Sequence, residues 1–383
     1  MTKFNRFDNE QEEMRDAEDG VLESVRASAI TMTAIEWLWL NRFALGKVGI
    51  IAGLPDMGKG QMLSYIAAQV TRKDREAWPC NEGMPLKGNV LLLTAEDDPS
   101  DTVVPRLLAA GADLSRIEIV KMVRNEATGK RRMFSLVTDI DALRKKIDEV
   151  GNVILIEIDP ITAYLGHGKI DSFRDTDVRA VLAPLVELAA EKKIAIIAVM
   201  HFNKKVEITN ALLRISNSLA FGAAARHVFG VVPDTENNRR LMVRAKNNLA
   251  AEDNNKALAY HFGNIVVATD PNNGKPIEAS YILWEPKYID ISATEAMQAA
   301  CENKSPGAID EAKEFLLEIL ANGPVSKAEI DEAARAHCIS NASLRRAQKL
   351  LEIETWKNNT NPKGGWFWRL KEQPKSKSYW SND

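Results

Sequence analysis

The sequence predicts an α/β fold in which a mainly parallel sheet lies between helices, followed by a smaller α+β unit. Continuous apolar runs begin at Val48, Val90, Val153 and Ile194, with helical stretches between them. Continuous rather than alternating runs are typical of parallel strands covered on both faces. The segment 177–193 has the apolar spacing of an amphipathic crossover helix. The first run ends in a glycine-rich turn that leads into a further helical pattern.

The overall composition excludes several classes of protein. Of the 383 residues, 45% are hydrophobic and 27% are charged, which argues against disorder, collagen-like repeats and a fibrous coil. The formal net charge is only −3, so any contact with nucleic acid has to come from a local patch. The three cysteines are far apart in sequence and odd in number, which fits neither a disulfide framework nor a C-x-x-C metal site.

Membrane-spanning and exported proteins are disfavoured as well. The sequence has no run of about 18 apolar residues, and its N-terminal segment is acidic without an apolar stretch. We therefore expect a cytoplasmic protein in a reducing compartment, with no membrane among its partners.

Changes in composition divide the chain into five parts. Residues 1–25 are rich in charge and are expected to form a tail, and residues 26–293 contain the apolar runs and form the main α/β domain. Residues 294–308 are small and polar with a Pro-Gly pair, which predicts a linker. Residues 309–371 have the helix and hairpin order of a winged-helix domain, and residues 372–383 are expected to form a frayed tail.

A phosphate-binding loop is predicted between the first strand and its helix. The segment GLPDMGK matches the first seven positions of G-x-x-x-x-G-K-[ST], in the strand, turn and helix context that this motif requires. In such loops backbone N–H groups wrap the phosphate oxygens, and the lysine neutralises the β and γ phosphates. We expect ATP to bind here with Mg²⁺; the alternative is a tight turn with a surface lysine. The candidate nucleotide-binding residues are Gly53, Pro55, Met57, Gly58, Lys59, Gly60 and Gln61.

The loop departs from the motif at two positions. Gly60 stands where serine or threonine normally supplies a hydroxyl to Mg²⁺, so the direct metal ligand from the loop is missing. Asp56 adds a carboxylate that would repel phosphate if it pointed inward, and we expect it to point to solvent. The sequence therefore predicts nucleotide binding and leaves open how the metal is held.

Acidic residues at the ends of later strands supply the other groups that ATP hydrolysis requires. Asp159 closes the run VILIEIDP, where an acid would hold the metal through its water shell. Glu96, at the end of VLLLTAEDD, is the candidate catalytic base, and the alternative is that it caps the next helix. Glu157 shares a strand face with Asp159; it is either a second acid of the site or, as we favour, a salt-bridged structural carboxylate.

Six segments form a linked set of motifs between roughly residues 30 and 290. They are GLPDMGK, LLLTAEDDPSDTVVPRLLAAGADLSRI, VILIEIDPITAYLG, VMHFNKK, RISNSLAFGAAARHVFG and LMVRAKNN. Together they resemble the RecA-like hexameric ATPases of the RepA type of plasmid replicative helicase. The resemblance implies a RecA-like P-loop NTPase core that assembles into a homo-oligomeric ring, a hexamer, and works on single-stranded DNA in DNA replication.

The resemblance also implies roles for individual residues. Glu96 would act as the catalytic carboxylate and Asp159 as the Walker B acid and metal ligand. His201 would sense the γ-phosphate, with Lys204 beside it. Without the resemblance, a lone histidine at the end of a strand is more often structural.

Rings of this family complete each active site with a basic residue from the neighbouring subunit. The resemblance points to Arg214 or Arg226 as this finger, together with Lys246 in RAKNN. Arg106 matches a further basic position of the family, from which it would face phosphate or pair with an acid of the AEDD segment.

The third helix of the C-terminal domain carries a small basic patch. Arg345, Arg346 and Lys349 have no acid among them between positions 341 and 351, which suits a recognition helix lying against a phosphate backbone. The domain as a whole has ten basic and nine acidic residues over 309–371, so it is not a basic DNA binder overall. Winged-helix units also serve as protein docking modules, and that alternative stays open.

The leading interpretation is a DNA-associated ATPase that moves on single-stranded DNA, possible duplex contact coming through the winged helix, or that remodels a replication complex. Two alternatives come from different classes. In the first, ATP binds with little hydrolysis and the chain is a nucleotide-gated DNA-binding regulator. In the second, it is a RecA-like scaffold whose winged helix binds protein.

Overall fold

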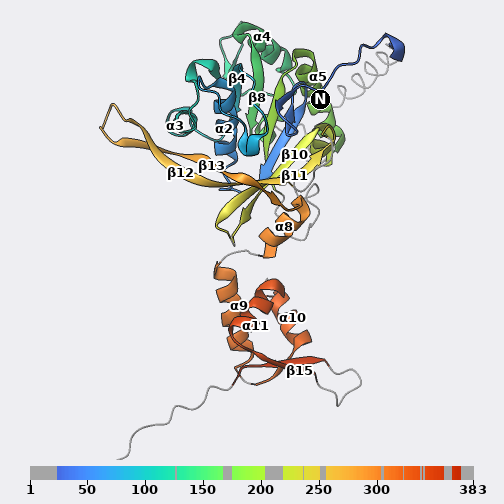
Figure 1. Ribbon diagram of the computed structural model, residues 1–383, viewed down its shortest axis with the longest axis vertical. Helices are drawn as coiled ribbons and strands as arrows, with labels where there is room; N and C mark the ends of the chain where they lie inside the picture. Colours follow the sequence, from blue (N-terminus) through green and yellow to red (C-terminus); the bar gives the residue numbers. More distant parts are fainter. Residues whose placement is uncertain are drawn as a thin grey trace, which may run out of the picture. The chain divides into compact units, whose positions relative to one another are not determined.

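The main body of the computed structural model is a sheet of nine strands within the described residues, ordered β13-β12-β11-β10-β3-β9-β8-β4-β5 (Figure 1). The strands from β10 to β5 pair in parallel, and β11, β12 and β13 extend the sheet in antiparallel fashion. The predicted α/β architecture with a mainly parallel sheet is therefore confirmed. The strands are β3 (Val48–Gly53), β4 (Asn89–Thr94), β5 (Ile117–Val120), β8 (Val153–Asp159), β9 (Ala195–His201), β10 (His227–Asp234), β11 (Arg239–Asn247), β12 (Lys256–Thr269) and β13 (Pro276–Asp290).

The structure describes residues 24–125, 127–166, 175–202, 219–235, 237–250, 256–302, 306–321, 323–336, 339, 341–357 and 365–371. A first unit ends at Glu36, and its described part holds the short 3-10 helix η1 (Ala27–Ala29). The expected N-terminal tail and C-terminal tail lie almost wholly outside the described residues. Within the described residues, no helix has the length and apolar character needed to cross a bilayer.

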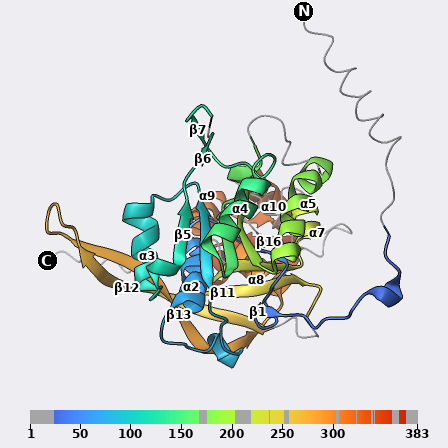
Figure 2. The ribbon, with the colours of Figure 1, turned by 90° about the horizontal axis from the view of Figure 1, so that it is seen from above.

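Helices cover both faces of the sheet because successive side chains of each central strand alternate between two cores. Ile51 and Ile197 point into the core beneath α2 (Lys59–Thr71) and α3 (Val104–Ala109). Ile50 and Ile196 point into the core beneath α4 (Ile140–Val150) and α5 (Asp175–Lys192). The helix expected over 177–193 is thus present, and Figure 2 shows α2 and α3 on one side of the sheet and α4 and α5 on the other.

Shorter elements connect these layers. They are the turns of helix η2 (Pro79–Asn81), η3 (Pro99–Val103), η4 (Leu114–Arg116) and η5 (Ile161–Tyr164), helix α7 (Leu219–Ala224), and the paired strands β1 (Trp37–Trp39) with β2 (Phe43–Ala44) and β6 (Val123–Arg124) with β7 (Arg131–Arg132).

Helix α8 (Ala293–Glu302) corrects the linker that was expected over 294–308. Ala293, Ala296 and Met297 are buried in the main core, and the helix packs on β10 and β11. Their i, i+3, i+4 spacing gives the helix one apolar face, although the segment is small and polar on average. A Cβ atom at Gly230 of β10 would lie 2.6 Å from Cε of Met297, so the glycine leaves room for this contact. The main domain therefore continues through α8.

The C-terminal residues form a small α+β unit with a core of its own. It contains α9 (Pro306–Ile319), α10 (Lys327–Ala336), α11 (Asn341–Leu350) and a sheet ordered β14-β16-β15, made of β14 (Val325–Ser326), β16 (Trp366–Arg369) and β15 (Glu354–Lys357). Leu316, Leu344 and Trp368 are buried together. Trp356 and Trp366 are exposed, so of the three tryptophans that could fill this core only Trp368 does so.

His227 ties the first strand of the antiparallel extension to the N-terminal part of the main body. The ring is buried, its Nε2 accepts a hydrogen bond from the N–H of Ala44 at 3.3 Å, and its Nδ1 lies 3.1 Å from Oδ1 of Asn247. These contacts suit the neutral ring, because a protonated Nε2 would face the Ala44 N–H, donor against donor. Burial lowers the pKa of His227 to about 4.

This histidine predicts a loss of stability in acid. The unfolded chain takes up the proton near pH 6.5 and the folded chain only near pH 4, so stability falls as pH drops through this window, by about 3 kcal/mol in total. In His227→Gln the amide oxygen keeps an acceptor for Ala44 without titrating. Thermal melting of both proteins between pH 7 and pH 4 should show a smaller fall in Tm for the variant; parallel curves would contradict the prediction.

Candidate nucleotide-binding site

The predicted phosphate-binding loop joins β3 to α2 through a left-handed turn. Gly58, the residue before the helix, has φ +81°, a conformation that residues with a side chain rarely adopt. A Cβ atom at Gly58 would also lie 2.4 Å from Cζ of Phe262. At the other end of the loop, a Cβ atom at Gly53 would lie 2.9 Å from the carbonyl oxygen of Val231. Both motif glycines are therefore required by packing.

Lys59 holds its charge inside the loop. Its side chain is only 7% exposed, and Nζ donates a hydrogen bond to the carbonyl oxygen of Leu54 at 2.7 Å. Burial lowers the pKa of the ammonium group, while the nearby carboxylates of Asp159 and Glu96 oppose that shift. The lysine therefore sits between the loop backbone and the acids, where an incoming phosphate group would compete for it.

The antiparallel extension braces the loop from outside. Tyr260 of β12 donates its hydroxyl hydrogen to the carbonyl oxygen of Met57 at 2.6 Å. Gln61, at the start of α2, donates from Nε2 to Oγ of Ser280 in β13 at 2.9 Å. With the Phe262 ring against Gly58, these contacts fix the loop at three successive points.

A cavity of about 530 Å³ opens above the loop, a size within the usual range for small-molecule sites. Three sequence-predicted residues meet there, at the carboxyl ends of neighbouring parallel strands: Glu96 after β4, Asp159 in β8 and His201 in β9. The cavity is lined by Pro55, Asp56, Gly58, Lys59, Gly60, Gln61, Glu96, Asp97, Arg106, Asp159, His201, Arg240 and Phe262. Asp56 is exposed.

Glu96 and His201 face each other across the cavity. Nε2 of His201 lies 3.9 Å from Oε2 of Glu96, and the Glu96 side chain is 62% exposed. Burial and the Lys59 ammonium lower the pKa of His201. The capping role considered for Glu96 belongs instead to Asp98, whose Oδ1 accepts a hydrogen bond from the N–H of Ser100 at 2.7 Å. Glu96 is thus left facing the cavity.

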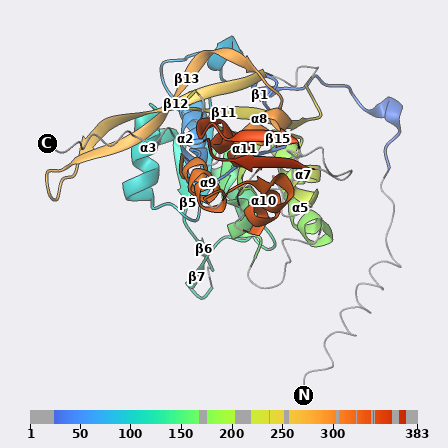
Figure 3. The ribbon, with the colours of Figure 1, turned by 90° about the horizontal axis from the view of Figure 1, so that it is seen from below.

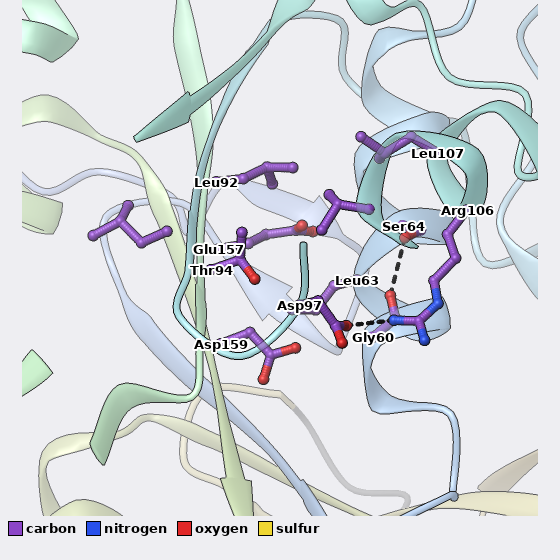
Figure 4. Close-up of a pocket in the computed structure, with 12 residues that line it drawn as sticks. Gly60, Leu63, Ser64, Leu92, Thr94, Asp97, Arg106, Leu107, Glu157 and Asp159 are labelled. Atoms are coloured by element: carbon purple, nitrogen blue, oxygen red, sulfur yellow. Dashed lines mark hydrogen bonds and ion pairs between the residues drawn. The ribbon is translucent and has the colours of Figure 1, made fainter. Parts of the chain in front are cut away.

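Asp159 and Glu157 lie on one face of β8 and differ in their surroundings (Figure 4). Burial and the carboxylates of Asp97 and Glu96 raise the pKa of Asp159 to about 6. Glu157 is 2% exposed, and its Oε1 has no hydrogen-bond partner among the described residues. Burial and the Asp159 carboxylate raise the pKa of Glu157 well above its usual range. The salt bridge favoured for Glu157 is therefore wrong, because no described cation reaches it and its neutral form is preferred instead.

The place of the missing loop hydroxyl is occupied by an ion pair. Figure 4 shows Arg106 beside Gly60, with its Nη1 2.5 Å from Oδ2 of Asp97. A Cβ atom at Gly60 would lie 3.0 Å from Nη1 of Arg106 and 3.9 Å from Oδ2 of Asp159. Of the two partners suggested for Arg106, an acid of the AEDD segment is the one observed.

The residues present fit a nucleotide with Mg²⁺. The glycine turn leaves a concave space over a helix N-terminus with a buried lysine, as phosphate oxygens require. For the metal, Asp159 offers a carboxylate oxygen, a hard ligand of the kind Mg²⁺ prefers, and phosphate oxygens and water would supply the rest. No group of three or more His, Cys, Asp or Glu side chains in the described part of the chain is arranged as a metal site.

Other candidate residues lie away from this cavity. Nζ of Lys246 donates to the carbonyl oxygens of Gly222 and Ala225 at 2.6 and 2.9 Å, at the end of α7. Arg226 is exposed. Arg214 and Lys204 lie outside the described residues. The proposed DNA-binding residues Arg345, Arg346 and Lys349 lie on α11.

Two cavity residues were not anticipated from the sequence. The guanidinium carbon of Arg240 in β11 lies 4.0 Å from the ring centroid of Phe262 in β12, and Nε of Arg240 is buried without a hydrogen-bond partner among the described residues. The strands that carry them were expected, but which of their residues reach the loop depends on strand pairing, for which the sequence offers no signal.

Comparisons with known proteins place the loop within a known family of domains. The AAA_25 family model, described as an AAA domain, matches residues 11–207, more than half of the chain. Among solved structures, the ATPase domain of a helicase aligns with 14% sequence identity and a TM-score of 0.41, covering 68% of this chain and 95% of that chain. No curated protein matches the sequence.

The left-handed turn predicts that Gly58→Ala is damaging. Alanine at φ +81° costs about 1–2 kcal/mol, and its Cβ would collide with Phe262, so the variant should melt at lower temperature and lose ATP binding. The control is Gly83→Ala, where φ is +90° and no described atom lies within 4 Å of the added Cβ. It imposes similar backbone strain away from the cavity. Equal loss of ATP affinity in both variants, measured by titration calorimetry, would refute the assignment.

Proposed function

The chain belongs to the AAA_25 family of AAA domains, and from this membership we propose that it is an ATP-hydrolysing motor that acts on DNA. Its specific form is a replicative helicase or DNA-remodelling ATPase of the RepA type. The proposal is supported above all by one observation: Lys59, Glu96, Asp159 and His201, which come from four separate segments, line the same cavity. Binding and cleavage of a triphosphate require these four kinds of group together.

Each of these residues has a role set by its position. Lys59 would exchange the Leu54 carbonyl oxygen for phosphate oxygens, because a charged acceptor makes the stronger hydrogen bond. Bound Mg²⁺ would neutralise charge on the phosphates, and Asp159 would hold it directly or through water. Glu96 would orient the attacking water, and His201 would donate a hydrogen bond to the terminal phosphate.

A neighbouring copy of the chain would complete the site in a hexameric ring. Of the described cations at the cavity, Arg106 is already paired with Asp97 and Arg240 is stacked on Phe262. A finger from the next subunit, Arg214 or Arg226, would add the charge that phosphoryl transfer requires. Lys246 could take part only after releasing the carbonyl groups at the end of α7.

The nucleotide-gated regulator remains a second candidate because of the surroundings of Gly60. The loop offers no hydroxyl to the metal, and the Arg106–Asp97 ion pair fills that place. A site built in this way could bind ATP well and cleave it slowly.

The three helices and three-stranded sheet of the C-terminal unit support a winged-helix domain over 309–371. We propose that α11 is its recognition helix, with Arg345, Arg346 and Lys349 against phosphate groups. The scaffold alternative assigns the same unit to a protein partner.

Lys59→Ala tests the nucleotide site. Removal of the buried ammonium group should abolish measurable binding of a non-hydrolysable ATP analogue in titration calorimetry, and ATPase activity with it. Lys87→Ala, which removes an exposed lysine elsewhere, should leave both intact. Equal heats for wild type and Lys59→Ala would remove the basis of the proposal. If single-stranded DNA does not stimulate steady-state hydrolysis by wild type, the motor part fails and the regulator stands.

The double change Arg345→Glu with Arg346→Glu tests the C-terminal unit. Reversal of two charges should lower the affinity for a labelled duplex by at least about ten-fold in fluorescence anisotropy. An unchanged affinity would favour the protein-docking role.

A further inference from the structure

A hairpin outside the nucleotide cavity concentrates positive charge. Residues 121–133, named here the basic hairpin, contain five basic residues and one acidic residue, in a chain whose net charge is −3. The hairpin consists of β6 and β7, which follow the edge strand β5. Figures 2 and 3 show it extending away from the sheet. Lys121, Arg124, Lys130 and Arg131 are all exposed.

The tip of the basic hairpin is a defined turn. The N–H of Asn125 donates to the carbonyl oxygen of Lys130 at 2.9 Å, and the N–H of Gly129 donates to the carbonyl oxygen of Asn125 at 2.8 Å. Oδ1 of Asn125 also accepts from the N–H of Thr128 at 2.8 Å. The cations therefore project from a fixed backbone, which lowers the entropy cost of binding a ligand.

The base of the hairpin is anchored to the main domain. Both terminal nitrogens of Arg132 donate to the buried carboxylate of Asp139 at 2.5 Å. Beyond it, Phe134 is buried against Tyr164, and the N–H of Leu136 donates to the carbonyl oxygen of Tyr164 at 2.8 Å. Arg132 is thus structural, and the other four cations are left for a ligand.

The strand register places two of these cations directly opposite each other. Arg124 pairs with Arg131 across the hairpin, and like charges in opposite positions destabilise a strand pair. Among the described residues, neither guanidinium group has an acidic partner. A polyanion bound along this face would relieve the repulsion.

We infer that the basic hairpin binds the phosphate backbone of a nucleic acid, an inference that rests on the proposed function. Regularly spaced phosphates suit a row of exposed cations that has no pocket for side chains. A membrane surface fits less well, because the turn itself carries Asn125, Ala127, Thr128 and Gly129 and no bulky apolar residue to insert.

The test compares wild type with Arg124→Gln/Arg131→Gln and with the control Lys87→Gln/Lys145→Gln, which removes two exposed cations elsewhere. Fluorescence anisotropy with a labelled single-stranded oligonucleotide should show binding about ten-fold weaker for the hairpin variant. Its slope of log K against log salt should shrink by about 1.4, or 0.7 for each lost phosphate contact. The control variant should match wild type, and Arg124→Lys/Arg131→Lys should restore binding.

Folding and nucleotide binding serve as internal checks. Because removal of the like-charge pair relieves strain in the hairpin, the glutamine variant should melt at or above the wild-type temperature. Its affinity for an ATP analogue should be unchanged, which separates this inference from the nucleotide site. Equal loss of oligonucleotide binding in the hairpin and control variants, or no binding by wild type, would overturn the inference. So would unchanged oligonucleotide binding with lost adsorption to phosphatidylserine vesicles.

Discussion

The left-handed turn at Gly58 is the constraint on which the rest of the site depends. It lets the chain leave β3 and enter α2 within a few residues, so that the free N–H groups of the helix start face the cavity. The turn is held from behind by Phe262 and Tyr260 of β12. The antiparallel strands are therefore a structural support for the loop as well as an extension of the sheet. A disturbance of β12 or β13 would reach the loop through these contacts.

The charges of the cavity balance one another before any nucleotide binds. Glu96, Asp97 and Asp159 lie close enough to raise the pKa of Asp159, and Lys59 and Arg106 partly offset them. Glu157 avoids the conflict because burial favours its neutral form. A nucleotide with its metal would replace this internal balance with phosphate oxygens on the cations and Mg²⁺ on the acid. The glycine at position 60 allows Arg106 to approach, so the departure from the loop motif and the position of this arginine have one structural cause.

Much of the parallel half of the protein could be predicted from the sequence. Strands buried on both faces leave continuous apolar runs, and residues at their carboxyl ends must lie at one edge of the sheet, as Glu96 and His201 do. The antiparallel half was less predictable, because register decides that Phe262 rather than a neighbour reaches Gly58. The pairing of Glu157 was misjudged because the rule that buried charges are paired does not cover a carboxyl group that stays neutral. Helix α8 was taken for a linker since its apolar face consists largely of alanine.

The most direct measurement of the central claim is the structure of the full chain with a non-hydrolysable ATP analogue and Mg²⁺. We expect the terminal phosphates within hydrogen-bond distance of Nζ of Lys59, released from the Leu54 carbonyl oxygen, with the turn at Gly58 unchanged. An analogue bound elsewhere, or a Lys59 that remains on Leu54 while the cavity holds no phosphate, would contradict the account.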